Sequence, residues 1–253
     1  MPESTLEPCV LVTGAGKRLG RAIALDLAKA GYKVAVHYNS SARDAEDVVR
    51  QIGKARAAAL KANLAVESET ESLVPRAEAA LGPLTALVNN ASLFEEDSAR
   101  SMTKASWDAH MAINLRAPIL LSQIFAKRLP EGAEGAIVNI ADQRVLKLTP
   151  KFFSYTISKA ALWAATQTLA QALAPRIRVN AIGPGPTLKG ARQSEADFAR
   201  QNAATILERG SPPQDICDAV RYLLSARSVT GQLIAVDGGQ HLAWKSSDTD
   251  LNE

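Results

Sequence analysis

The sequence predicts an α/β protein, a single domain built on a doubly wound parallel sheet with helices on both faces. Short apolar runs alternate with longer stretches of helical periodicity along the whole chain, and this alternation is typical of parallel strands joined by helical crossovers. The length of 253 residues suits one large domain and is short for two. Residues 1–253 are therefore expected to form one domain, with flexible tails at 1–7 and 245–253.

Each element is expected where its pattern begins and ends. The apolar runs expected to be strands are 9–12, 33–37, 57–60, 84–88, 136–140, 178–182 and 233–236. The first helix, 21–30, has Ile23, Leu27 and Ala30 at helical spacing, and Gly31 follows it as a C-cap. The other expected helices are a polar one ending near residue 53, 67–81, segments through Trp107 and Asn114 to Leu129, one containing Tyr155, and 213–225. A turn is expected at 183–187, followed by a polar, mobile segment to about Arg209.

Composition excludes several classes of function. The net charge of +3 is modest and Lys and Arg form no tract, so nucleic-acid binding is not indicated. Cys9 and Cys217 match no metal or redox spacing and are expected to be reduced core thiols, with no metal site. No run stays apolar for about 20 residues, and residues 1–8 contain no apolar signal core. Neither export nor membrane insertion is expected, and the protein is expected to be cytoplasmic.

The turn between the first strand and the first helix, residues 13–20, carries Gly14, Gly16 and Gly20. A strand, a glycine-bearing turn and a helix together present backbone N–H groups and a positive helix end to a phosphate. The turn does not fit the G-x-G-x-x-G pattern, because Leu19 occupies the last glycine position. By itself it fits a dinucleotide site and an ordinary glycine turn equally well.

The end of the second strand indicates which dinucleotide would bind. Enzymes that select NAD usually carry an acidic residue there to hold the ribose 2′-hydroxyl. This chain has the neutral stretch Tyr38-Asn39-Ser40-Ser41 instead, with Lys17 and Arg18 available nearby. The pattern favours NADPH over NADH, and the alternative is an ordinary polar loop.

Tyr155 and Lys159 lie four residues apart at the head of an alanine- and leucine-rich run. On a helix this spacing places both side chains on one face. A cation within about 4–6 Å of a phenol lowers its pKa from the ordinary value of ~10, so the tyrosine could shuttle a proton near neutral pH. The spacing alone favours a chance pair on an amphipathic helix, and it is the place of the pair in the chain that favours the catalytic interpretation.

Taken together, the motifs of the chain resemble the short-chain dehydrogenase/reductase family, whose fold is Rossmann-type. The matching segments, in chain order, are Thr13-Gly14 to Gly20, Asn89-Asn90-Ala91, Asn114, Tyr155 with Lys159, Pro184-Gly185 and Val236-Asp237-Gly238-Gly239. The resemblance implies that Tyr155 donates a proton, that Lys159 holds the nicotinamide ribose and depresses the pKa of the tyrosine, and that Asn114 supports a water relay. The cofactor-binding residues it implies, with those of the second strand's end, are Gly14, Lys17, Arg18, Leu19, Gly20, Tyr38, Asn39, Ser40, Ser41, Asn63, Leu64, Asn90, Ala91, Ser92, Tyr155, Lys159, Pro184, Gly185 and Thr187.

Three departures from the common family pattern refine the resemblance. Arg18 replaces the middle glycine of the turn, Asp142 replaces the usual catalytic serine, and Ser92 replaces the last glycine of Asn-Asn-Ala-Gly, with Phe94 shortly after it. This combination resembles the pteridine reductase branch, which includes bacterial dihydromonapterin reductases. In that branch the arginine contacts cofactor and pterin, the phenylalanine stacks on the pterin, and the aspartate joins the tyrosine in catalysis. The substrate-binding residues implied are Arg18, Ser92, Phe94, Asp142 and Tyr155.

Some members of the branch carry His-Arg after the second strand to bind the 2′-phosphate, and this chain has Asn39-Ser40 there. The favoured function is an NADPH-dependent reductase that transfers hydride to a C=N carbon of a pterin, with Tyr155, Lys159 and Asp142 handling the proton. The first alternative is a carbonyl reductase acting on a ketone or 3-oxoacyl group. The second is a catalytically idle NADP-binding sensor. A small-molecule substrate is expected as the partner, and the family implies a homotetramer.

Overall fold

The structure is a computed structural model and describes residues 6–190 and 192–244. Of the tails expected at 1–7 and 245–253, only Leu6 and Glu7 belong to the described residues. Glu7 pairs with Lys33 at the start of the second strand. Within the described residues, no helix is long and apolar enough to cross a bilayer.

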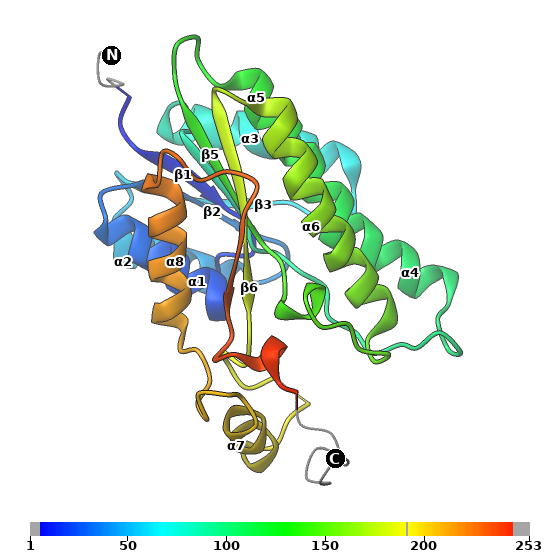
Figure 1. Ribbon diagram of the computed structural model, residues 1–253. Coiled ribbons are helices and arrows are strands. Elements are labelled where there is room, and N and C mark those ends of the chain that lie inside the picture. The colour runs from blue at the N-terminus through cyan, green and yellow to red at the C-terminus, as the bar shows by residue number, and fades with distance from the viewer. Residues whose placement is uncertain (1–5, 191, 245–253) are drawn as a thin grey trace, which may run out of the picture.

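Seven parallel strands form one sheet in the order β3-β2-β1-β4-β5-β6-β7 (Figure 1). The strands are β1 (Cys9–Val12), β2 (Lys33–Tyr38), β3 (Ala57–Lys61), β4 (Ala86–Asn89), β5 (Gly135–Ile140), β6 (Ile177–Pro184) and β7 (Leu233–Val236). Strands β1 and β4 are neighbours although two strands lie between them in sequence, so the chain reverses its direction of winding there. In open α/β sheets such a reversal leaves a crevice at the carboxyl ends of the strands, where ligands bind. The doubly wound fold expected from the sequence is confirmed.

Helices cover both faces of the sheet (Figure 1). On one face α1 (Arg18–Lys29), α2 (Ala42–Ile52) and α8 (Pro213–Ser225) pack into one apolar core with alternate residues of the strands. On the other face α3 (Glu67–Leu81), α5 (Ala117–Arg128) and α6 (Phe153–Leu173) form a second core around Leu11, Leu121 and Phe125. Helix α4 (Lys104–Met111) contacts α6. The two cores fix the sheet from both sides and leave its carboxyl edge for the loops.

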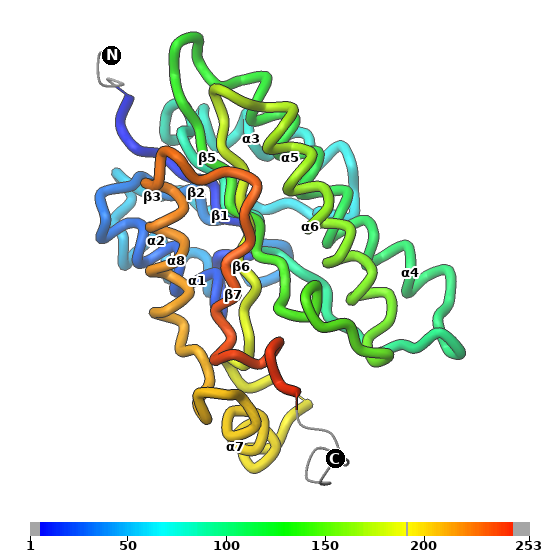
Figure 2. Tube along the Cα trace, in the orientation of Figure 1, coloured from blue at the N-terminus to red at the C-terminus, as the bar shows by residue number. Residues whose placement is uncertain are grey.

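Two segments differ from the sequence-based expectation. The strand expected at 178–182 extends to Pro184, because its last residues pair with β7, so the turn expected at 183–187 begins later. The polar segment expected up to Arg209 contains a helix, α7 (Glu195–Ala203), whose start is fixed by reciprocal hydrogen bonds between Ser194 and Asp197. Figure 2 shows α7 at the end of the molecule where β6 and β7 finish.

Candidate active site

The loops after β1 and β4 are joined by a small hydrogen-bond network. Thr13 Oγ1 accepts from the backbone N–H groups of Asn90 and Ala91, at 2.9 Å each, and the Asn90 side-chain amide donates to Thr13 O at 2.8 Å. Gly14 has a φ of +63°, which favours glycine. A Cβ on Gly20 would lie 2.2 Å from Gly14 O. Only glycine therefore permits this close approach of the helix start to the turn.

His37 fixes the turn from the side of β2. Its Nδ1 accepts from Gly14 N at 2.9 Å, and its Nε2 lies 3.0 Å from Ala62 O. Burial lowers the pKa of His37 to about 4, so the ring is neutral at pH 7. With Nδ1 accepting, Nε2 carries the proton and donates to Ala62 O.

Arg18 keeps a backbone conformation that favours glycine, with a φ of +51°. This explains how it can stand where the family usually has glycine, at a strain of about 1–3 kcal/mol. Its guanidinium donates to Lys189 O at 2.9 Å and to Leu188 O at 3.1 Å, linking the glycine turn to the loop after β6. Lys17 forms an ion pair with Asp44 of α2 at 3.2 Å.

A cavity of about 440 Å³ lies along the glycine turn and the ends of β2, β3 and β4. It brings together most of the expected cofactor-binding residues, namely Gly14, Lys17, Arg18, Leu19, Gly20, Asn39, Asn63, Leu64, Asn90, Ala91 and Ser92. Tyr38, Ser40 and Ser41 do not line it. Tyr38 packs against the core instead, and the Ser41 hydroxyl would lie 2.9 Å from a Cβ on Gly16, so it sits beside the turn.

A second cavity, of about 580 Å³, continues from the first, and both are lined by Arg18, Leu19, Asn90 and Ser92. It is lined by a further group of the expected residues, namely Phe94, Asp142, Tyr155, Lys159, Pro184, Gly185 and Thr187. The two cavities and the close-packed glycine turn form a groove that fits an extended dinucleotide, with Asp142, Tyr155 and Lys159 at one end.

Asn114 lines neither cavity and lies behind them, fully buried in a π-helical turn (Ala112–Arg116) between α4 and α5. Its Oδ1 accepts from Leu93 N at 2.8 Å and from Ser92 Oγ at 3.2 Å, and its Nδ2 donates to Leu93 O at 2.9 Å and Ser158 Oγ at 3.0 Å. The side chain thus ties the loop after β4 to α6. Single π-turns are frequent at functional sites.

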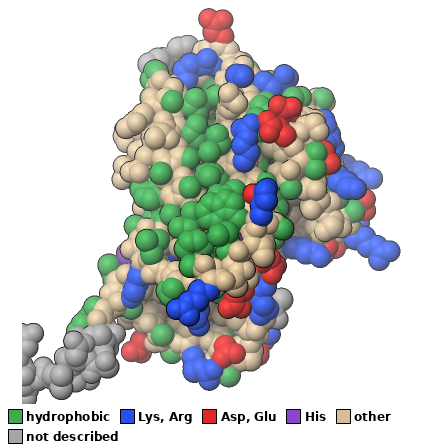
Figure 3. All heavy atoms as spheres, turned by 90° about the vertical axis from the view of Figure 1, so that its right-hand side faces the viewer, with side chains coloured by type: hydrophobic (Ala, Val, Ile, Leu, Met, Phe, Trp, Pro, Cys, Tyr) green, Lys and Arg blue, Asp and Glu red, His purple; other side chains and the backbone are tan. Residues whose placement is uncertain are grey.

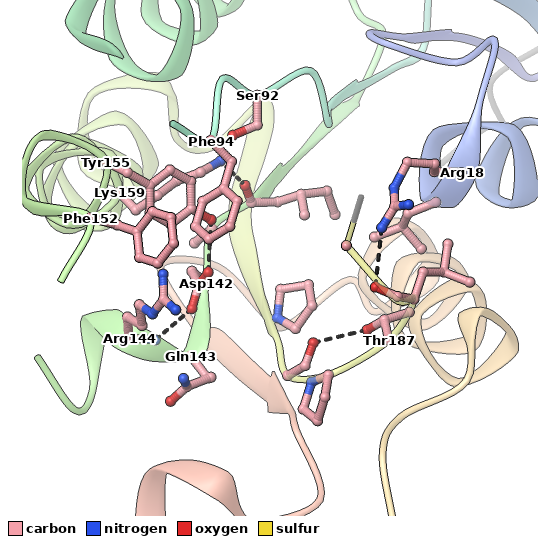
Figure 4. Close-up of a pocket in the computed structure, with 18 of the residues that line it drawn as sticks. Arg18, Ser92, Phe94, Asp142, Gln143, Arg144, Phe152, Tyr155, Lys159 and Thr187 are labelled. Carbon is pink, nitrogen blue, oxygen red and sulfur yellow. Dashed lines mark hydrogen bonds between the residues drawn. The ribbon is translucent and has the colours of Figure 1, made fainter. Parts of the chain in front are cut away.

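Tyr155 and Asp142 are in direct contact, because Tyr155 Oη donates to Asp142 Oδ2 at 2.7 Å (Figure 4). Burial and the neighbouring carboxylate raise the pKa of Tyr155 well above its ordinary value. The lowered pKa expected for Tyr155 is therefore not found. Lys159 Nζ donates to Ile140 O at 2.7 Å and lies 5.8 Å from the centroid of the phenol ring. Burial lowers the pKa of Lys159 itself to about 8.

Phe94 packs in an aromatic cluster at the mouth of the larger cavity. Its ring stacks on Phe152 with centroids 4.3 Å apart and meets the edge of Tyr155 at 4.6 Å (Figure 4). The guanidinium of Arg144 lies 5.3 Å from the Phe94 centroid, and that of Arg192 lies 5.7 Å from it. Phe94 is 41% exposed, so a flat ligand can reach an aromatic surface beside the tyrosine.

Several side chains of this cavity were not expected from the sequence. Gln143 and Arg144 follow Asp142 directly, so their position in the chain could have indicated them. Phe152 has a φ of +55° before α6, a conformation that no sequence pattern reveals for phenylalanine. Arg192 reaches the site from the loop before α7, where it donates to Phe94 O at 2.7 Å and Glu95 at 2.6 Å.

Comparisons with known proteins agree with this geometry. A family model described as enoyl-(acyl carrier protein) reductase matches residues 14–241. A short-chain type dehydrogenase/reductase from Picea abies is 34% identical over 246 residues, covering 91% of each chain. The protein belongs to the short-chain dehydrogenase/reductase family. It is thus an oxidoreductase of this family, as the motifs of the sequence suggested.

Two further proteins that are similar to this dehydrogenase/reductase carry the names of different reductases. The 3-oxoacyl-[acyl-carrier-protein] reductase FabG of Staphylococcus aureus is 33% identical over 240 residues, covering 92% of this chain and 97% of its own. The solved structure of FolM alternative dihydrofolate reductase 1 from Brucella canis, complexed with NADP, is 50% identical. It superposes with a TM-score of 0.92 and covers 96% of this chain and 97% of its own. Its NADP agrees with the cofactor expected from the sequence.

Proposed function

We propose that the protein is an NADPH-dependent reductase of a pterin, acting on a C=N bond. The observation that carries this proposal is the hydrogen bond of 2.7 Å between Tyr155 Oη and Asp142 Oδ2. A carboxylate beside the tyrosine can relay a proton to a ring nitrogen, whereas the serine usual in the wider family does so poorly. The 50% identity to a FolM dihydrofolate reductase supports the same substrate class.

The groove fits NADP(H). Gly14, Leu19 and Gly20 would lie against its phosphates, Asn63 and Leu64 against the adenine, and Lys159 against the nicotinamide ribose. When bound, the nicotinamide supplies the hydride. The site's own residues then have two tasks, which are to hold the substrate ring beside Tyr155 and to deliver a proton.

The proton donor is Tyr155. Because its pKa is raised, the hydroxyl keeps its proton at neutral pH, as a donor in a reduction must. The proton leaves Tyr155 Oη for the substrate nitrogen, and Asp142, already hydrogen-bonded to that oxygen, relays protons to the phenol. Phe94 offers a ring face to one side of the flat pterin, and Arg18 and Ser92 line the same cavity.

The test is steady-state turnover with NADPH, comparing dihydropterins and dihydrofolate with a panel of ketones and 3-oxoacyl thioesters. The parent should prefer the pterins. Asp142→Ser should reduce pterin turnover by about 10²–10⁴-fold and spare simple ketones. Phe94→Ala should mainly raise KM for pterins, because stacking aids ground-state binding. Preference of the parent for ketones, with a harmless Asp142→Ser, would refute the pterin assignment.

That result would favour the second candidate, a carbonyl reductase, which rests on the 33% identity to FabG. In that case Tyr155 protonates a ketone oxygen and Asp142 acts only as its polar partner. The same panel of substrates separates the two candidates. The catalytically idle sensor is the outcome if NADPH binds and neither class is reduced.

The preference for NADPH rests on the neutral end of β2, where Asn39 lines the cofactor cavity. Asn39→Asp should narrow or reverse the preference, because a carboxylate repels a 2′-phosphate and accepts a hydrogen bond from a 2′-hydroxyl. Fluorescence titration with NADPH and NADH measures both affinities. Equal affinities in the parent would contradict the proposal.

A homotetramer is also proposed. Figure 3 shows hydrophobic side chains gathered at the centre of the face toward which α4, α5 and α6 lie. On this side Ile157 of α6 is 37% exposed. Apolar patches on soluble proteins often mark contacts between subunits. Light scattering of the purified protein would test the assembly, and a monomer at micromolar concentration would refute it.

A further inference from the structure

We propose that Arg144 is a positioning residue whose positive charge stabilises the negative charge shared by Asp142 and Tyr155. The inference rests on the proposed role of Tyr155 as proton donor, and it adds a cation that neither the sequence motifs nor the comparisons assign. Arg144 lies in the turn after β5, so this turn would supply the charge that acts on the proton of Tyr155.

The Asp142–Tyr155 pair needs a nearby cation. Tyr155 is 6% exposed, and it shares a hydrogen bond with a carboxylate, so negative charge gathers where little water can solvate it. Lys159 does not meet this need at the phenol oxygen, because its Nζ donates to Ile140 O. It lies as near to the Tyr155 ring as Arg144 does, at 5.8 Å from the centroid, but Arg144 is the cation that lowers the pKa of Tyr155.

Arg144 supplies a cation near the Asp142–Tyr155 pair. Its backbone N–H donates to Asp142 Oδ1 at 2.8 Å, leaving Oδ2 to Tyr155. Its guanidinium carbon lies 5.9 Å from the centroid of the Tyr155 ring and 5.0 Å from that of Phe152. The same residue thus orients the carboxylate through its backbone and places a charge beside the phenol through its side chain.

The charge of Arg144 is not neutralised within the described residues. No carboxylate there forms an ion pair with it, and its Nη1 is buried without a hydrogen-bond partner. The other guanidinium over the phenylalanines, that of Arg192, is paired with Glu95. A cation without an ion-pair partner in a partly buried site interacts more strongly with nearby charges than it would in bulk water. The charged groups that line the cavity with Arg144 are Arg18, Glu95, Asp142, Lys159 and Arg192.

The charge of Arg144 lowers the pKa of Tyr155. Burial and Asp142 raise the pKa of Tyr155, and Arg144 acts in the opposite direction. Removing the Arg144 charge should therefore move the ionisation of the Tyr155 phenol to still higher pH. A unit charge near 6 Å in a partly buried site moves a titration by on the order of one pH unit.

The test is the pH profile of kcat/KM for the best substrate of the parent, in Arg144→Met, Arg144→Lys and the control Arg192→Met. Arg192 lies 5.7 and 5.8 Å from the Phe94 and Phe152 centroids, much as Arg144 does, and has no recorded contact with Tyr155. Arg144→Met should move the profile upward by on the order of one pH unit, Arg144→Lys should largely restore it, and Arg192→Met should leave it in place. An unshifted Arg144→Met profile overturns the inference, as does an equal shift in the control.

A second measurement needs no turnover and keeps failure of the proposed function separate. Carbon-13 NMR of the tyrosine ring Cζ atoms, with Tyr155 assigned from Tyr155→Phe, follows the phenol directly. Its ionisation step should lie at higher pH in Arg144→Met than in the parent. If this step moves while no pterin is reduced, the inference holds and the proposed substrate class fails. If pterins are reduced and the step stays in place, only the inference fails. Lys in place of Arg144 keeps the charge and provides the test should the methionine variant fold poorly.

Discussion

Replacing Lys159 by methionine is expected to change how the stability of the protein depends on pH. Lys159 is 2% exposed, and burial lowers its pKa from 10.5 to about 8. Because the folded pKa lies below the unfolded one, the unfolded chain binds more protons between about pH 8 and 10.5. The contribution of this group to stability therefore rises with pH across that window. Below it, the buried ammonium opposes folding.

The size of the effect follows from the same pKa. A fall from 10.5 to about 8 corresponds to about 3 kcal/mol of unfolding free energy. About 2 kcal/mol of this is recovered between pH 7 and pH 9.5. The methionine variant carries no charge at any pH and lacks this gain. Its stability relative to the parent should thus fall by about 2 kcal/mol over that range. The lost hydrogen bond to Ile140 O does not depend on pH and leaves this difference unaffected.

Urea unfolding of both proteins without cofactor, at several pH values from about 7 to 9.5, measures this difference. Lys127→Met is the matched control, because Lys127 lies exposed on α5 and water surrounds its ammonium in both states. Its stability relative to the parent should stay constant with pH. A constant difference for Lys159→Met as well would refute the reasoning, since it would mean that the folded protein solvates the ammonium as well as water does.

Three further substitutions, one of them with a matched control, test the site. Gly20→Ala should lower the unfolding free energy by about 1–3 kcal/mol and weaken NADPH binding, although alanine favours helices, because its Cβ would lie 2.2 Å from Gly14 O. Gly16→Ala in the same turn meets its nearest atom, a serine hydroxyl, at 2.9 Å and should cost less; equal urea curves for the two would contradict the close approach. Arg18→Gly should leave the unfolding free energy within about 1 kcal/mol of the parent, since relief of strain offsets the added chain entropy, while weakening NADPH and substrate binding in fluorescence titrations. Tyr155→Phe should keep NADPH affinity and lose about 10²–10⁴-fold in kcat; parent-like turnover would exclude Tyr155 as the donor.

The sheet could be predicted because its strands are buried on both faces and read as continuous apolar runs. The run at 9–12 and the helices at 67–81 and 213–225 were placed with the bounds that the structure has. The helix α7 was missed because it buries none of its residues. Its start depends on polar hydrogen bonds at Ser194, whereas hydrophobic periodicity reports only on burial.

Residues of the candidate site could be predicted where their position directly after a strand favours a particular residue type. In a parallel sheet, the residues that directly follow the strands lie at its carboxyl edge, and Gly14, Asn90 and Asp142 hold such positions. The structure brings them to one groove. The sequence could not show that Tyr38 turns toward the core, or that Phe152 folds back onto Phe94. Both depend on side-chain packing and backbone conformation, which the order of residues does not encode locally.

The protonation state of Tyr155 was the least predictable feature, because it depends on the hydrogen-bond partners of the side chains around it. A spacing of four residues places Lys159 near Tyr155, yet the ammonium hydrogen-bonds to Ile140 O instead of the phenol. With a carboxylate on its hydroxyl, Tyr155 is held as a protonated donor. Had serine stood at position 142, the phenol would have lost its strongest acceptor and the raising effect of that charge. The substitution that distinguishes this chain from the wider family therefore adds to the effect of burial and helps to keep the tyrosine protonated.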